Sequence, residues 1–69
     1  MTNNHASTTA NILELLLINQ NAIAAGLEEV ALWIKERGSL ETHENVIGAL
    51  ATLDLNASAI QQGIEKLNR

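Results

Sequence analysis

The stretch Lys35-Glu36-Arg37-Gly38-Ser39-Leu40-Glu41-Thr42 divides this sequence of 69 residues into two helices. Basic side chains favour the C-terminal end of a helix, and a glycine directly after them can adopt the left-handed conformation that ends many helices. The sequence therefore predicts that a first helix ends at Arg37 and that residues 38–42 form a short turn. Ser39 or Thr42 is expected to cap a second helix over residues 43–68.

Apolar residues repeat at alternating three- and four-residue spacing on both sides of this turn, as they do along the contact line, or seam, of a coiled coil. A first helix is predicted over residues 9–37, after a flexible polar tail over residues 1–8, with a capping hydroxyl from Ser7, Thr8 or Thr9. Its predicted seam consists of Leu13, Leu16, Gln20, Ile23, Leu27, Val30 and Ile34. The predicted seam of the second helix consists of Val46, Leu50, Leu53, Ala57, Ile60, Ile64 and Leu67.

The two seams are in register when the chain folds back on itself. Facing positions then have numbers that sum to 80, so that Leu27 faces Leu53 and Ile34 faces Val46. The midpoint, residue 40, falls inside the predicted turn. The sequence therefore predicts an all-α fold in which one domain, residues 1–69, forms an antiparallel two-helix hairpin.

A single seam gives a domain of this size little core, and the chain has no cysteine with which to reinforce it. The first helix carries a second stripe of residues beside the seam, with small side chains at its middle that would let another helix approach. We therefore expect a homodimer in which two hairpins form a four-helix bundle. The expected dimer interface consists of Ile12, Leu15, Asn19, Ala22 and Gly26.

Composition and charge exclude several classes of function. Lys and Arg total 4 against 8 for Asp and Glu, and a net charge of -4 disfavours direct binding to nucleic acid. The apolar run from Ile12 to Ile18 is shorter than the roughly 20 residues of a membrane span, so we expect no membrane insertion. No Lys or Arg precedes His5 to begin a secretory signal, so we expect the protein in the cytoplasm.

The sequence contains no recognisable catalytic motif. His5 lies in the predicted tail, and His43, at the start of the second helix, is expected to face solvent. Neither histidine follows a glutamate by three positions, the spacing found in di-iron bundles, and the four glycines are isolated from one another. We therefore expect no enzyme activity, no metal and no cofactor.

The first helix offers a surface for a partner protein. Ile18, Ala25 and Leu32 recur every seven residues on the side away from the seam, with carboxylates beside them. Such an apolar ridge suits either a partner with a basic rim or a further part of the dimer interface. The candidate partner-binding residues are Ile18, Ala25, Glu28, Glu29, Leu32, Trp33 and Glu36.

Two residues on the first helix allow more than one interpretation. Trp33 either covers Leu40 or Ile47 as part of the core, or is exposed and contributes strongly to an interface, since tryptophan is enriched at such positions. Gln20 occupies a seam position, where its amide needs a hydrogen-bonding partner. A single polar residue in a seam often fixes register or oligomeric state, and this structural role is the interpretation that we prefer for Gln20.

The chain resembles a family of small anti-quorum-sensing proteins, which are early inhibitors made by temperate phages of pseudomonads. The resemblance spans nearly the whole chain and is carried by its length, its two long helices, and the stretch Val30-Ala31-Leu32-Trp33-Ile34-Lys35-Glu36-Arg37-Gly38-Ser39 leading into Glu44-Asn45-Val46. It implies a homodimer that inhibits host proteins by direct contact in the cytoplasm of a bacterial cell.

Two host partners follow from this resemblance. One is the DNA-binding region of a LuxR-type quorum-sensing activator (LasR), and the other is the type IV pilus assembly ATPase (PilB). Blocking them would silence quorum sensing and prevent pilus-dependent superinfection. The resemblance assigns no binding residue. The alternative from a different class is a structural or assembly homodimer that has no host target.

Overall fold

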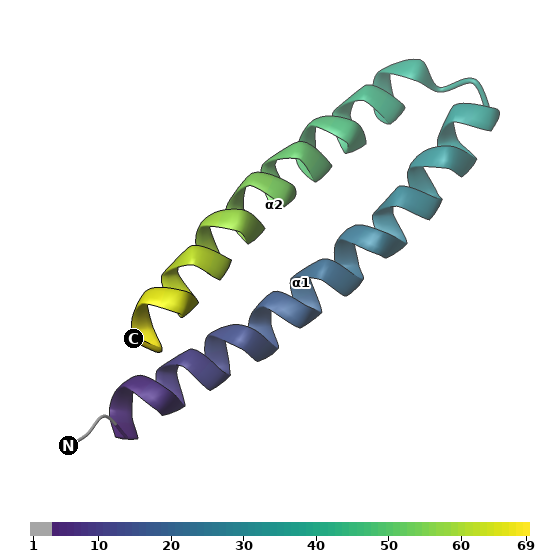
Figure 1. Cartoon of the computed structure of the whole chain (residues 1–69). Coiled ribbons are helices and arrows are strands. Elements are labelled where there is room, and N and C mark those ends of the chain that lie inside the picture. The colour runs from purple at the N-terminus through teal and green to yellow at the C-terminus, as the bar shows by residue number, and fades with distance from the viewer. Residues whose placement is uncertain (1–3) are drawn as a thin grey trace.

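The computed structural model describes residues 4–69, which form two long helices joined by a tight turn (Figure 1). Helix α1 spans Asn4–Glu36 and helix α2 spans Leu40–Leu67. The helices run antiparallel and side by side, so that the start of α1 and the end of α2 lie at one end of a rod measuring 57 × 15 × 11 Å. The predicted all-α hairpin is confirmed.

The turn is shorter than predicted because Gly38, two residues after the end of α1 at Glu36, reverses the chain. Gly38 has a φ of 84°, in the left-handed region. Its amide donates a hydrogen bond to the carbonyl of Lys35 at 3.0 Å, and the amide of Ser39 donates to the carbonyl of Ile34 at 3.4 Å. These two bonds form a Schellman motif, which satisfies carbonyls at the end of a helix. As a result, α2 begins at Leu40 rather than at residue 43.

Ser39 is the N-cap residue of α2, but its side chain caps no backbone amide. Its hydroxyl donates instead to the hydroxyl of Thr42 at 3.0 Å. At the other end of the hairpin, α1 includes Ser7, Thr8 and Thr9, so the predicted caps and the predicted tail are wrong for residues 4–8. The helix extends to this point because Ala10 is buried in a cluster that includes Leu67 of α2. Residues 1–3 of the predicted tail lie outside the described residues.

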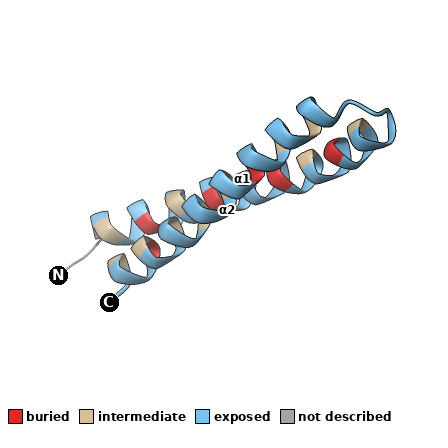
Figure 2. Ribbon diagram, turned by 90° about the horizontal axis from the view of Figure 1, so that it is seen from above, coloured by how far each residue is buried: buried red, intermediate tan, exposed pale blue. Residues whose placement is uncertain are grey.

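The predicted seam of α2 is confirmed at every position, whereas that of α1 is half correct. Leu13, Gln20, Leu27 and Ile34 are partly buried, as expected. Leu16, Ile23 and Val30 are 57%, 61% and 46% exposed, and the positions next to them, Leu17, Ala24 and Ala31, are buried in their place. Figure 2 shows the buried positions spaced along the whole hairpin.

The register differs from the predicted one by three residues. Buried and partly buried positions mirror one another about the peptide between Gly38 and Ser39, so their numbers sum to 77 rather than 80. Small residues of α1 then face larger ones of α2: Ala24 faces Leu53, and Ala31 faces Val46. This combination lets the helices approach closely, which is why alanines rather than Ile23 and Val30 occupy the seam.

Candidate functional site

The seam contains one polar side chain of α1, and it is hydrogen-bonded. The Nε2 of Gln20 donates to the backbone carbonyl oxygen of Leu53 at 3.1 Å, in a partly buried position. This bond joins two residues that lie 33 positions apart in the sequence. A polar group in an apolar seam loses stability unless it finds a partner, so the bond makes Gln20 compatible with its position.

The residues that flank the seam divide the hairpin into two faces of different character. On both helices, the residue just before each fully buried one lies on the same side of the hairpin, because the helices are right-handed and antiparallel. We call this side the uncharged face, and its central residues are Leu16, Ile23 and Val30 of α1 with Ala49, Asn56 and Gly63 of α2.

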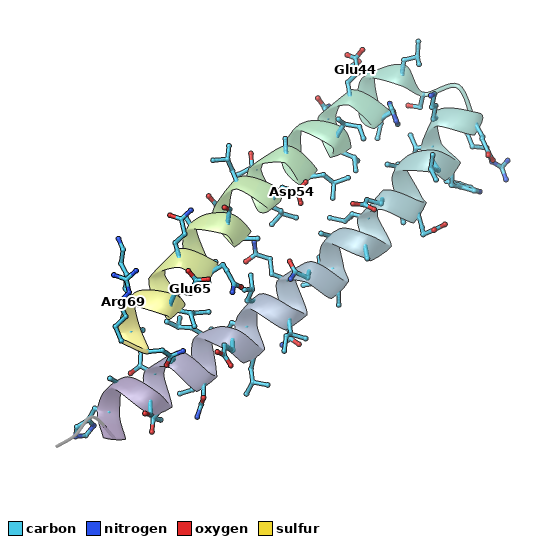
Figure 3. All side chains as sticks on the ribbon, viewed as in Figure 1. Glu44, Asp54, Glu65 and Arg69 are labelled. Carbon is cyan, nitrogen blue, oxygen red and sulfur yellow. The ribbon has the colours of Figure 1, made fainter. Side chains whose placement is uncertain are left out.

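The opposite side, which we call the charged face, carries most of the ionisable residues next to the seam. Its flanking residues are Glu14, Asn21, Glu28 and Lys35 of α1 with Ile47, Asp54 and Gln61 of α2. Further charges lie on the outer side of the rod, where Glu44 and Arg69 point away from α1 (Figure 3). The two faces of one hairpin therefore differ in their charge.

All of the predicted partner-binding residues are exposed. Ile18 and Leu32 are 62% and 57% exposed, and Ala25 lies between them on the outer side of α1. Glu28 and Glu36 are exposed near the turn end of the same helix. Exposure makes these residues accessible to a partner, and their role in binding stays a prediction.

Trp33 lies outside the core, so the interpretation that it covers Leu40 or Ile47 is wrong. The indole is 55% exposed, and the guanidinium of Arg37 lies 4.6 Å from the centre of its ring. A cation in this position is attracted to the face of the ring. Leu40 and Ile47 are also exposed, at 64% and 46%, so the turn end of the hairpin presents several large apolar side chains to solvent.

The predicted dimer-interface residues are exposed as well. Ile12, Leu15, Asn19, Ala22 and Gly26 lie on the outer side of α1, beside the uncharged face. Sequence reasoning missed Leu16, Ile23 and Val30 as surface residues because it placed them in the seam. The position of Gly38 is the signal that would have found them, since a mirror centred on the turn selects Leu17, Ala24 and Ala31 for the seam instead.

Neither a pocket nor a metal-binding group is present within residues 4–69. No cavity is found there, and no three His, Asp or Glu side chains lie together in an arrangement that would hold a metal ion. His43, which was expected to face solvent, is partly buried at the start of α2.

Helix α1 is long and apolar enough, by length and composition alone, to cross a membrane. The expectation of no membrane insertion rested on the short run from Ile12 to Ile18, whereas the qualifying segment covers His5–Glu36. Only 17% of the apolar stretch is buried inside the hairpin. The exposed apolar surface of α1 therefore needs an explanation.

No family model, no curated protein and no solved structure matches this chain.

Proposed function

We propose that this chain is a non-enzymatic, phage-encoded inhibitor that acts in the cytoplasm of a bacterial host as a homodimer. Its targets are the DNA-binding region of a LuxR-type quorum-sensing activator (LasR) and the type IV pilus assembly ATPase (PilB). The identity of these targets comes from the family resemblance. The physical support comes from the surface of the hairpin.

The observation that carries this proposal is the coincidence of exposed apolar side chains and carboxylates near the turn. Leu32 and Trp33 are more than half exposed, and Glu28, Glu29 and Glu36 are exposed around them. Interfaces combine an apolar centre with a polar rim, and aromatic residues are enriched in them.

The charge of the hairpin is concentrated in the same region. Residues 28–44 contain five of the eight acidic side chains and two of the four basic ones, which gives this segment a net charge of -3 out of -4 for the whole chain. A surface that binds DNA phosphates is basic, so an acidic protein surface can cover it and compete with DNA. This complementarity supports the DNA-binding region as the target.

The direct test is a pull-down with the tagged protein from a host lysate at two salt concentrations. Recovery of the activator or the pilus ATPase, in a smaller amount at the higher salt concentration, is the expected result because exposed charges are screened by salt. Replacing Glu28 and Glu29 together by lysine should abolish recovery. The matched control is Glu65→Lys, which reverses an exposed charge at the other end of the hairpin.

A structural or assembly homodimer is the second candidate, and the large exposed apolar surface of α1 favours it. In this case the lysine substitutions at Glu28 and Glu29 leave function intact, whereas disrupting the seam at Leu27 or Leu53 destroys it. The two candidates therefore respond in opposite ways to changes near the turn.

A further inference from the structure

The isolated hairpin exposes more surface than a compact protein of its mass. Its solvent-accessible surface is 5231 Å² for 7.4 kDa. A folded monomeric protein of that mass exposes about 4,200 Å². The excess of about 1,000 Å² is close to the roughly 800 Å² that each partner buries in a protein interface of standard size.

The uncharged face contributes an apolar line to this exposed surface. Leu16, Ile23 and Val30 repeat every seven residues along α1 and are about half exposed or more. Positions at this spacing form a continuous line on a helix, as required for contact with a second helix. The same series of positions is Thr9, Leu16, Ile23 and Val30 before it reaches Arg37 at the turn, so no ionisable residue interrupts the apolar line.

The α2 side of the same face includes a glycine, Gly63, that packing within the hairpin does not require. A Cβ added at Gly63 would meet nothing within 4 Å. Glycine inside a helix costs roughly 1 kcal/mol relative to alanine, so the absence of a side chain at this position has no benefit within the hairpin. It has a benefit if another helix packs closely against α2.

The two halves of the uncharged face are complementary in size. The α1 side carries the large side chains of Leu16, Ile23 and Val30. The α2 side carries shorter side chains, or none, at the same seven-residue spacing: Ala49, Asn56 and Gly63. A symmetric dimer uses the same patch on both subunits, and closely packed helices alternate large and small side chains across the interface. In a symmetric dimer, the large residues of α1 in each copy can therefore pack against the shorter residues of α2 in the other.

We propose that a second copy of this chain covers the uncharged face, with Leu16, Ile23 and Val30 at the centre of the interface. This inference rests on the homodimer of the proposed function and identifies the surface that forms it. The surface differs from the stripe of Ile12, Leu15, Asn19, Ala22 and Gly26 predicted from the sequence. It leaves the charged face and the turn end free for a different protein.

Sedimentation velocity of three proteins tests this assignment. Ile23→Glu introduces a carboxylate into the proposed interface, and Asn21→Glu introduces the same group on the charged face of the same helix. We expect the wild type and Asn21→Glu to sediment as dimers. Ile23→Glu should raise the dimer dissociation constant at least about 100-fold, because the dimer loses two buried isoleucine side chains and would have to bury two carboxylates in their place.

A second measurement covers the case in which Ile23→Glu does not fold. The chain has no cysteine, so a cysteine introduced by substitution is the single thiol of the protein. Ile23→Cys should react with a thiol reagent more slowly as protein concentration rises and dimer forms, whereas Asn21→Cys should react at a constant rate. Equal behaviour of the two thiols in a dimeric protein would overturn the assignment of this face.

The outcomes separate this inference from the one on which it rests. A wild type that is monomeric at every concentration would contradict the homodimer itself. A dimer that Ile23→Glu leaves intact would contradict only the choice of face. A monomer that sediments with phosphatidylcholine vesicles, and loses this property in Ile23→Glu, would show that lipid rather than a second copy covers the uncharged face.

Discussion

The amide nitrogen of Gln20 donates a hydrogen bond to the main-chain carbonyl oxygen of Leu53 across the seam of the hairpin, at 3.1 Å. The acceptor is a backbone atom, so the bond does not depend on the side chain at position 53, whereas it requires a side-chain donor of the right length at position 20. The bond ties one position of α1 to one position of α2 and thereby opposes sliding of one helix along the other.

We predict that Gln20→Ala lowers the free energy of unfolding by about 1–2 kcal/mol, because it removes both the hydrogen bond and the packing of the side chain. Gln20→Leu should stay within about 1 kcal/mol of the wild type, since it removes the bond but adds apolar contacts. Urea unfolding followed by circular dichroism, at one fixed protein concentration, measures both changes. A Gln20→Leu variant that is less stable than Gln20→Ala would contradict this account.

Glycine has opposite roles at two positions, and alanine substitutions distinguish them. Gly38→Ala should destabilise the hairpin by about 1 kcal/mol or more, because the φ of 84° at this position is unfavourable for a residue with a side chain. Gly48→Ala should stabilise it by about 0.5–1 kcal/mol, since position 48 is helical and a Cβ there would meet nothing within 4 Å. Thermal unfolding of the two variants should shift the midpoint in opposite directions.

Two leucines of α2 test where the core lies. Leu50 is 6% exposed and Leu55 is 73% exposed. Leu50→Ala should cost about 2–4 kcal/mol, because it removes a buried side chain and leaves a cavity. Leu55→Ala should change stability by less than about 0.5 kcal/mol, as is usual for surface positions. Similar losses at the two positions would mean that Leu55 is buried by a partner.

Trp33 is the single tryptophan, and the chain has no tyrosine or phenylalanine, so the intrinsic fluorescence reports the environment of this one side chain. The indole lies beside Arg37 and is more than half exposed, so the free protein should show the red-shifted emission of a solvated tryptophan. Binding of a partner at the turn end should shift the emission to shorter wavelength. Arg37→Ala should leave the fold intact, since a cation–π contact at an exposed site contributes only about 0.5–1 kcal/mol.

The sequence was sufficient to predict the hairpin because its strongest signals are local. Gly38 follows two basic residues within the preceding turn, and the seam of α2 is made mostly of large apolar residues separated mainly by small or polar ones. No second line of large side chains competes with that seam. The existence, direction and approximate bounds of both helices follow from these features.

The seam of α1 could not be assigned from the sequence with the same certainty because two patterns overlap on it. Both share Leu13, Gln20, Leu27 and Ile34, and they differ in whether the intervening positions are Leu16, Ile23 and Val30 or Leu17, Ala24 and Ala31. Hydrophobicity favours the first set. Close approach of the helices favours the second, because large residues of α2 fill the space above Ala24 and Ala31.

The candidate site depends directly on this distinction. With Leu16, Ile23 and Val30 in the seam, the hairpin would have no apolar line on the uncharged face. With these three residues outside it, the hairpin has an uncharged face suited to a second copy and a charged face suited to a basic partner. The sequence predicts a dimer through the neighbouring stripe of Ile12, Leu15, Asn19, Ala22 and Gly26, whereas we propose that Leu16, Ile23 and Val30 form the interface.

The most direct test of the proposed function is calorimetric titration of the purified DNA-binding region of a LuxR-type activator with this protein, with and without operator DNA. The account predicts saturable binding that weakens as salt increases and that competes with the DNA. It also predicts that replacing Glu28 and Glu29 by lysine abolishes binding, whereas Glu65→Lys does not. Binding that is absent in the wild type, or that leaves the operator complex undisturbed, would contradict the proposal.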